Sequence, residues 1–98
     1  MEIVKPASAG TLESSDIAIR IEPNEKKGLE IHLTSSVMQQ FGKKIEGVIR
    51  DTLGELGVTD AYVDAVDKGA LDCAVKARTA AAAFRAADST DVEWRVKQ

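Results

Sequence analysis

Two short segments of the chain alternate apolar and polar residues with a period of two, which is typical of half-buried β-strands. In the first, Ile17, Ile19 and Ile21 are separated by Ala18 and Arg20, and Pro23 follows the segment. In the second, residues 29–34, leucine and isoleucine alternate with glutamate, histidine and threonine. The polar run 23–28 lies between the two segments, so the pattern predicts a β-hairpin with a loop of five or six residues.

Two later segments have the spacing of amphipathic helices. In residues 37–56 apolar side chains recur every three or four positions, and Gly57 follows as a C-terminal cap. Ser36 and Gln39 have the spacing of a capping box at the start. This stripe places Phe41, Ile45 and Ile49 on one face, which we expect to be buried in the core against Ile19 and Ile31 of the strands. The apolar members of the stripe are Val37, Phe41, Ile45, Val48, Ile49, Leu53 and Leu56.

The remaining segments complete a small set of elements. Residues 61–66 read as a third main strand, and the alanine-rich residues 71–87 read as a second helix. The first nine residues are expected to form an extended arm or a short edge strand, because Pro6 does not fit a central strand. Residues 88–98 are expected to be a C-terminal tail or a short last strand.

The order strand, strand, helix, strand, helix predicts an α+β fold. We expect a two-layer sandwich, in which a small mixed sheet carries two helices on one face. The 98 residues are expected to form a single domain, because this length suits one modest core. The pattern does not favour the four-helix bundle of fatty-acid carrier proteins, because the conspicuous serines stand before a segment of period two.

Charge and cysteine content exclude several kinds of function. The formal net charge of -3 argues against a nucleic-acid-binding protein. Cys73 is the one cysteine, so no internal disulfide is possible, and at its place early in a helix we expect it to be a small packing residue. With no apolar run of membrane-spanning length and no apolar signal-peptide core after Met1, we expect a cytoplasmic protein without membrane contacts.

The stretch 10–16, Gly-Thr-Leu-Glu-Ser-Ser-Asp, is the candidate site. It places the adjacent hydroxyls of Ser14 and Ser15 between Glu13 and Asp16, in a composition typical of an exposed turn. A structural turn is the commoner explanation for such a cluster, and the turn pattern does not choose between the two hydroxyls. A serine hydrolase is not expected, because His32 is the one histidine and lies on the polar side of its strand. A metal site is not expected either.

Two blocks of sequence resemble the acyl carrier protein, or gamma chain, of bacterial citrate lyase. They are Gly-Thr-Leu-Glu-Ser-Ser-Asp at 10–16, followed by Arg-Ile-Glu-Pro at 20–23, and Asp-Lys-Gly-Ala-Leu-Asp-Cys at 67–73. The similarity runs from Lys5 to about Arg78. The resemblance implies that Ser14 carries a 2'-(5''-phosphoribosyl)-3'-dephospho-CoA arm through a phosphodiester. It implies a carrier subunit with no catalytic residue of its own.

The resemblance also implies a set of partners and a role in citrate fermentation. The arm would hold acetyl and citryl thioesters while the alpha and beta chains of citrate lyase cleave citrate to oxaloacetate and acetate. A holo-carrier synthase would transfer the arm, and an acetate ligase would charge it. Two alternatives remain open: the related carrier chain of malonate decarboxylase, and a structural subunit whose serine is never modified. Glu13 and Asp16 are either turn residues or carboxylates that repel the phosphodiester toward solvent.

Overall fold

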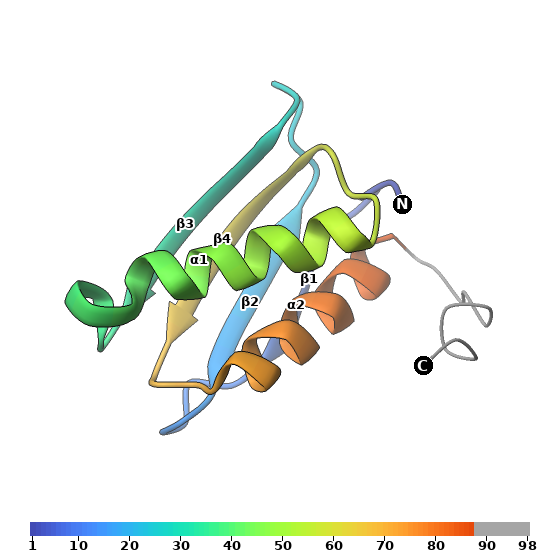
Figure 1. Cartoon of the computed structure of the whole chain (residues 1–98). Coiled ribbons are helices and arrows are strands. Elements are labelled where there is room, and N and C mark those ends of the chain that lie inside the picture. Colours follow the sequence, from blue (N-terminus) through green and yellow to red (C-terminus); the bar gives the residue numbers. More distant parts are fainter. Residues whose placement is uncertain (88–98) are drawn as a thin grey trace.

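The computed structural model describes residues 1–87 as four strands and two helices (Figure 1). The segment 88–98, expected to be a tail or short strand, lies outside the described residues. In chain order the elements are β1 (Ala7–Gly10), β2 (Ile17–Glu22), β3 (Leu29–Ser35), α1 (Met38–Glu55), β4 (Ala61–Asp67) and α2 (Asp72–Ala86). The expected edge strand near the N-terminus is therefore β1, at the end of the segment 1–9.

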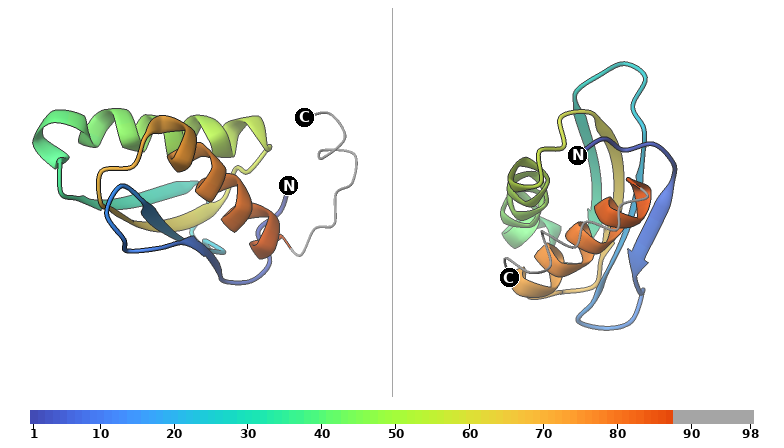
Figure 2. Two further views of the ribbon diagram at one scale, coloured as in Figure 1. Left: turned by 90° about the horizontal axis from the view of Figure 1, so that it is seen from below. Right: turned by 90° about the vertical axis from the view of Figure 1, so that its right-hand side faces the viewer.

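The four strands form one mixed sheet in the order β1-β2-β4-β3. Strand β2 is antiparallel to β1 and to β4, whereas β3 runs parallel to β4. Both helices lie on the same face of this sheet, as the end-on view in Figure 2 shows. The predicted α+β two-layer sandwich, with a small mixed sheet and two helices on one face, is confirmed.

The predicted hairpin between β2 and β3 is wrong, because β4 lies between them. Ile17 to Glu22 pair with Asp67 to Tyr62, and Leu29 to Ser35 pair with Ala61 to Asp67. A parallel neighbour requires a long crossover, and α1 supplies it between β3 and β4. The six residues 23–28 span two strand spacings, about 10 Å, which is well within their reach.

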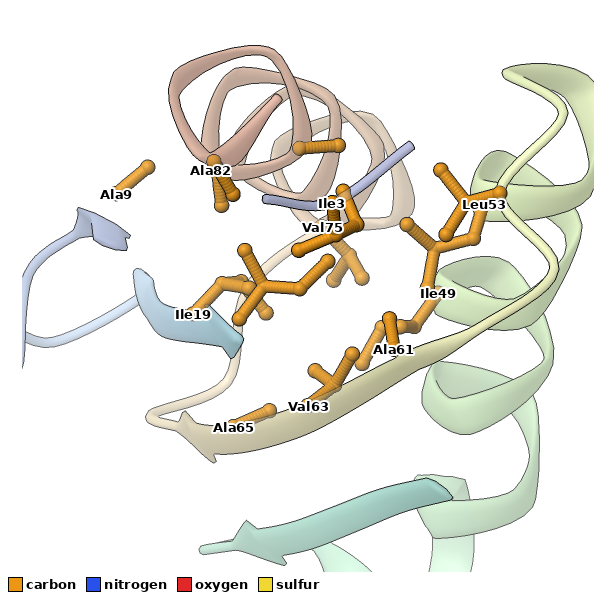
Figure 3. Close-up of a cluster of buried hydrophobic side chains, with 14 of the residues drawn as sticks. Ile3, Ala9, Ile19, Ile49, Leu53, Ala61, Val63, Ala65, Val75 and Ala82 are labelled. Atoms are coloured by element: carbon orange, nitrogen blue, oxygen red, sulfur yellow. The ribbon is translucent and has the colours of Figure 1, made fainter. Parts of the chain in front are cut away.

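The core fills the space between the sheet and the two helices (Figure 3). Helix α2 packs over β1 and β2, and α1 lies against β3 and α2. The isoleucines of β2 supply one wall of the core, while Ile49 and Leu53 of α1 and Val75 of α2 supply the other; all have less than 2% of their surface exposed. Small alanines on α2, such as Ala82 and Ala83, let the helix approach the sheet closely.

The ends of α1 match the expectation only in part. The predicted capping box is not formed: the N-cap residue is Val37, and it makes no side-chain cap. The hydroxyl of Ser35 accepts the N–H of Val37 instead, at 3.1 Å. At the other end Gly57 has φ +75, and Val58 N–H donates to the carbonyl of Leu53 at 2.9 Å, which confirms the glycine cap.

Two residues expected in the core are at the surface. Phe41 is 47% exposed, because it lies in the first turns of α1, which project past the end of the sheet (Figure 1). Ile45, one turn later, is 3% exposed and follows the prediction. Cys73 is exposed, because α2 turns Val75 and Thr79 toward the sheet and leaves Cys73 on the outer side. Within residues 1–87, no helix is long and apolar enough to span a membrane.

Candidate functional site

Ser14 stands at the corner of a tight turn between β1 and β2. The N–H of Asp16 donates to the carbonyl of Glu13 at 3.1 Å, which closes a four-residue turn over 13–16. Ser15, the third residue of the turn, has φ +66, the left-handed conformation that a type II turn requires there. Both serines are exposed, and within residues 1–87 neither serine hydroxyl makes a hydrogen bond.

The turn rests on the connection between β4 and α2. Ser15 N–H donates to the carbonyl of Lys68 at 2.8 Å, and Lys68 N–H donates to the carbonyl of Asp16 at 2.9 Å. These two bonds join the two sequence blocks 10–16 and 67–73, which are more than fifty residues apart. Together the blocks form one end of the molecule, where the turn and the start of α2 lie close together in Figure 1.

The carboxylate of Asp16 accepts four hydrogen bonds, from the loop, from β2 and from α2. It accepts the hydroxyl of Thr11 at 2.7 Å, the N–H of Ile17 at 2.7 Å, and two bonds from Arg78. The Arg78 bonds are Nε to Oδ1 at 3.1 Å and Nη2 to Oδ2 at 2.9 Å, which is the bidentate geometry of a strong ion pair. Hydrogen bonds first from Arg78 and then from Thr11 hold the pKa of Asp16 well below its ordinary value, and Asp16 raises the pKa of Arg78.

Asp16 is thus the residue that holds the turn. Of the two roles considered for it, the hydrogen bonds support that of a turn residue, since its negative charge is already paired with Arg78. Glu13 is exposed, and its N–H donates to the hydroxyl of Thr11 at 3.2 Å. Sequence reasoning did not assign Arg78 to the site. Arg78 and Asp16 are 62 positions apart in the sequence, so no local sequence pattern indicates that they pair.

A second carboxylate, Asp67, organises the neighbouring connection from inside. It is 1% exposed, and it accepts the hydroxyl of Ser35 at 2.8 Å and the N–H groups of Gly69 and Ala70, both at 3.0 Å. Gly69 has φ +89, as expected of a glycine that frees the backbone between a strand and a helix. Asp67 therefore shapes the connection against which the serine turn rests.

Two large apolar side chains in the two sequence blocks of this site are exposed. Leu12, within the serine loop, is 63% exposed, and Leu71, at the start of α2, is 73% exposed. Beside Leu71 lies an apolar groove of about 530 Å³ between α1 and the β4–α2 connection, with Phe41 in its lining. Phe41 and Leu71 line one groove, and exposed apolar side chains that share a groove are typical of a surface that contacts another protein.

Within residues 1–87, the one histidine does not lie beside Ser14. His32 lies in the middle of β3, opposite Asp64 of β4, and its ring stacks on Tyr62 with centroids 5.0 Å apart. Its side chain is 60% exposed, as its place on the polar side of the strand predicted. In residues 1–87, no three side chains of the histidine, cysteine, aspartate and glutamate types come together as metal ligands. The turn offers two adjacent accessible hydroxyls, those of Ser14 and Ser15, on a backbone held from β4 and α2.

Comparison with known proteins identifies the family. A family model described as the malonate decarboxylase delta subunit (MdcD) matches residues 4–86. Citrate lyase acyl carrier protein 2 of Salmonella typhimurium is 54% identical over 96% of this chain and 97% of its own length. The citrate lyase acyl carrier protein of Albidiferax ferrireducens is 50% identical over the full length of both chains. The chain belongs to the citrate lyase acyl carrier protein family.

The membership has direct consequences for the site. An acyl carrier protein bears its cargo on a covalently attached prosthetic group and is a carrier subunit, not a catalytic one. The solved structure of "a Pseudomonas malonate decarboxylase hetero-tetramer in complex with malonate" contains a chain with the same fold. Its TM-score is 0.69 at 17% identity, over 85% of this carrier and 84% of that chain.

Proposed function

We propose that this carrier is the acyl carrier subunit of citrate lyase, and that Ser14 bears its prosthetic arm. The observation that carries the proposal is the exposed, unbonded hydroxyl of Ser14 at the corner of a turn held from β4 and α2. Attachment there needs no rearrangement of the core. The arm is a 2'-(5''-phosphoribosyl)-3'-dephospho-CoA group, joined through a phosphodiester, and its thiol supplies the thioester chemistry.

Ser14 suits attachment better than its neighbour Ser15. The N–H of Ser15 donates to the carbonyl of Lys68, and the backbone of Ser15 is in the left-handed region. A residue other than glycine stays in that region only when other contacts hold it there. An enzyme that extended or opened the turn at Ser15 would have to break this contact. Ser14 precedes the held residue and faces solvent, so an enzyme reaches its hydroxyl without disturbing the turn.

The chain's own residues present the arm and do no chemistry on it. Arg78 neutralises Asp16, so Glu13 is the carboxylate beside Ser14 that has no ion-pair partner in residues 1–87. A phosphodiester on Ser14 would therefore be repelled mainly by Glu13, over the ~8–10 Å that physiological salt allows. The exposed Leu12 and Leu71 provide apolar contact area for the enzymes that work on the arm.

The partners follow from this role. They are the alpha and beta chains of citrate lyase, which cleave citrate to oxaloacetate and acetate, a holo-carrier synthase that transfers the arm, and an acetate ligase. The setting is the cytoplasm of a cell that ferments citrate, with no membrane or nucleic-acid partner. The relatives named for citrate lyase, at 50–54% identity, favour this over the malonate decarboxylase carrier, for which the 17% identical neighbour supports only the fold.

Intact-protein and peptide mass spectrometry test the proposal. The carrier is co-expressed with the arm-transferring enzyme as wild type, as Ser14→Ala and, as matched control, as Ser15→Ala. The expected result is the mass of one arm on wild type and on Ser15→Ala, mapped to Ser14, and no arm on Ser14→Ala. An arm on Ser15, or an arm that persists in Ser14→Ala, contradicts the site. A wild-type protein that supports citrate cleavage without an arm would make the unmodified structural subunit the right description.

A further inference from the structure

The serine turn is held by a side chain from a distant element, the guanidinium of Arg78 on α2. Its Nε donates to Oδ1 of Asp16 at 3.1 Å, and its Nη2 donates to Oδ2 of the same carboxylate at 2.9 Å. Two parallel bonds of this kind set the orientation of the carboxylate as well as its distance. The side chain of Asp16 is 15% exposed and that of Arg78 is 43% exposed, so solvent screens the pair only in part.

The contact continues along hydrogen bonds to the peptide just before Ser14. Asp16 Oδ2 accepts the hydroxyl of Thr11 at 2.7 Å, and the same hydroxyl accepts the N–H of Glu13 at 3.2 Å. Asp16 Oδ1 accepts the N–H of Ile17, the first residue of β2. Through these bonds, the contact of Arg78 with Asp16 helps to hold the backbone on both sides of the turn, at Glu13 and at Ile17. A connected set of this kind loses more than one bond when a member is removed.

We propose that Arg78 is a positioning residue for arm attachment: it fixes the 13–16 turn in the form in which Ser14 is recognised by the arm-transferring enzyme. This rests on the function proposed above. Ser15 at φ +66 is in a region that a residue other than glycine leaves when its holding contacts are lost. Without Arg78 the turn samples other forms, and the apparent affinity of the transferase falls with the fraction that remains competent.

Arg78 acts through charge as well as through geometry. When it is removed, Asp16 becomes an unpaired carboxylate two residues from Ser14, and it repels an anionic coenzyme A-derived donor. Lysine and glutamine separate the two contributions. Arg78→Lys keeps the positive charge and loses the planar fork, while Arg78→Gln loses both. Arg85, also on α2, is the matched control, because its Nη1 donates to the carbonyl of Ser8 at 2.8 Å on strand β1, away from the turn.

The test measures two quantities on Arg78→Lys, Arg78→Gln and Arg85→Gln. The first is the hydrogen-exchange rate of the Ser15 amide in the unmodified carrier alone. The second is kcat and KM for the carrier in arm transfer. Both Arg78 variants are expected to speed the exchange and to raise KM about fivefold or more with little change in kcat, the size of effect of one partly exposed ion pair. Arg85→Gln is expected to change neither.

Salt separates the contributions further. The additional rise in KM of Arg78→Gln over Arg78→Lys should shrink at 1 M salt, where charges are screened beyond about 3 Å. Wild-type exchange and wild-type KM in both Arg78 variants would overturn the proposal. If an Arg78 variant fails to fold, Asp16→Asn, which keeps the size of the side chain, takes its place. It breaks the ion pair without leaving an unpaired carboxylate, so faster exchange of the Ser15 amide and a raised KM are expected without the salt-dependent part, and wild-type exchange with wild-type KM would overturn the proposal. A wild-type carrier that is never modified on Ser14 would overturn the proposed function, whereas the exchange rates would still test the hold of Arg78 on the turn.

Discussion

Replacing Ile45 with alanine tests whether the apolar stripe of α1 is core along its length. Ile45 is 3% exposed, so nearly the whole side chain is withdrawn from water. The substitution removes three carbons, and at about 0.8 kcal/mol for each buried methylene the transfer contribution is about 2.4 kcal/mol. The cavity contribution should be small, because Ile45 also lines the open groove beside Phe41, and the space left behind joins that groove.

The neighbours on the same stripe bracket this value. Ile49 is fully buried, so Ile49→Ala leaves an enclosed cavity and should cost about 3–5 kcal/mol. Phe41 is 47% exposed, so Phe41→Ala should cost less than about 1 kcal/mol. Ile45→Ala is expected between the two, at about 2–3 kcal/mol. The order follows from position relative to the sheet, since the three residues share one helix face.

Urea unfolding, followed by far-ultraviolet circular dichroism, measures the three free energies. The slope of the free energy with urea should be the same in all variants, so that a shift of the midpoint reports stability alone. For a domain of this size, a loss of about 2.5 kcal/mol also lowers Tm by about 10–20 °C. An Ile45→Ala loss below about 0.5 kcal/mol would refute the placement of this face in the core. Partner binding would then be the better explanation of the stripe.

Three further outcomes are expected. Gly10→Ala should destabilise the protein more than Gly28→Ala. Both positions have positive φ, but a Cβ at Gly10 would overlap the carbonyl of Ile17, whereas a Cβ at Gly28 has no atom within 4 Å. Equal losses of stability in urea unfolding would contradict this expectation. Because the pKa of Asp16 is lowered on folding, its stabilisation is present above about pH 4 and is lost as the pH falls further, so the stability difference from Asp16→Asn should shrink on acidification. Leu71→Asp should slow arm transfer at unchanged stability, whereas Val4→Asp, exposed but far from Ser14, should not; equal transfer rates would exclude Leu71 from the contact surface.

The local elements of this protein were readable from the sequence. The alternation of Ile17, Ile19 and Ile21 predicted β2, and the stripe of period 3.6 predicted α1 to within a residue or two. Gly57 marked the end of a helix, and it has positive φ. These features depend on how one backbone segment presents its side chains to a single apolar environment, which is a property of nearby residues.

The candidate site was readable in part. The turn composition of 10–16 placed the serines at the surface, and the resemblance to a carrier family pointed to Ser14. The second block, 67–73, was recognised as belonging to the same family, but nothing in it showed that Lys68 would bond Ser15 and Asp16. The sequence of two separate blocks does not show how far apart they lie in the folded protein.

Three features were decided only by the tertiary structure: the place of β4 between β2 and β3, the exposure of Phe41, and the pairing of Arg78 with Asp16. In each case the local pattern fits more than one arrangement. A strand of period two pairs equally well with the next strand or with a later one, and an apolar helix position is buried only where the sheet extends beneath it. Long-range packing chooses among these arrangements, because it determines which choice buries the most apolar surface and leaves the fewest polar groups unbonded.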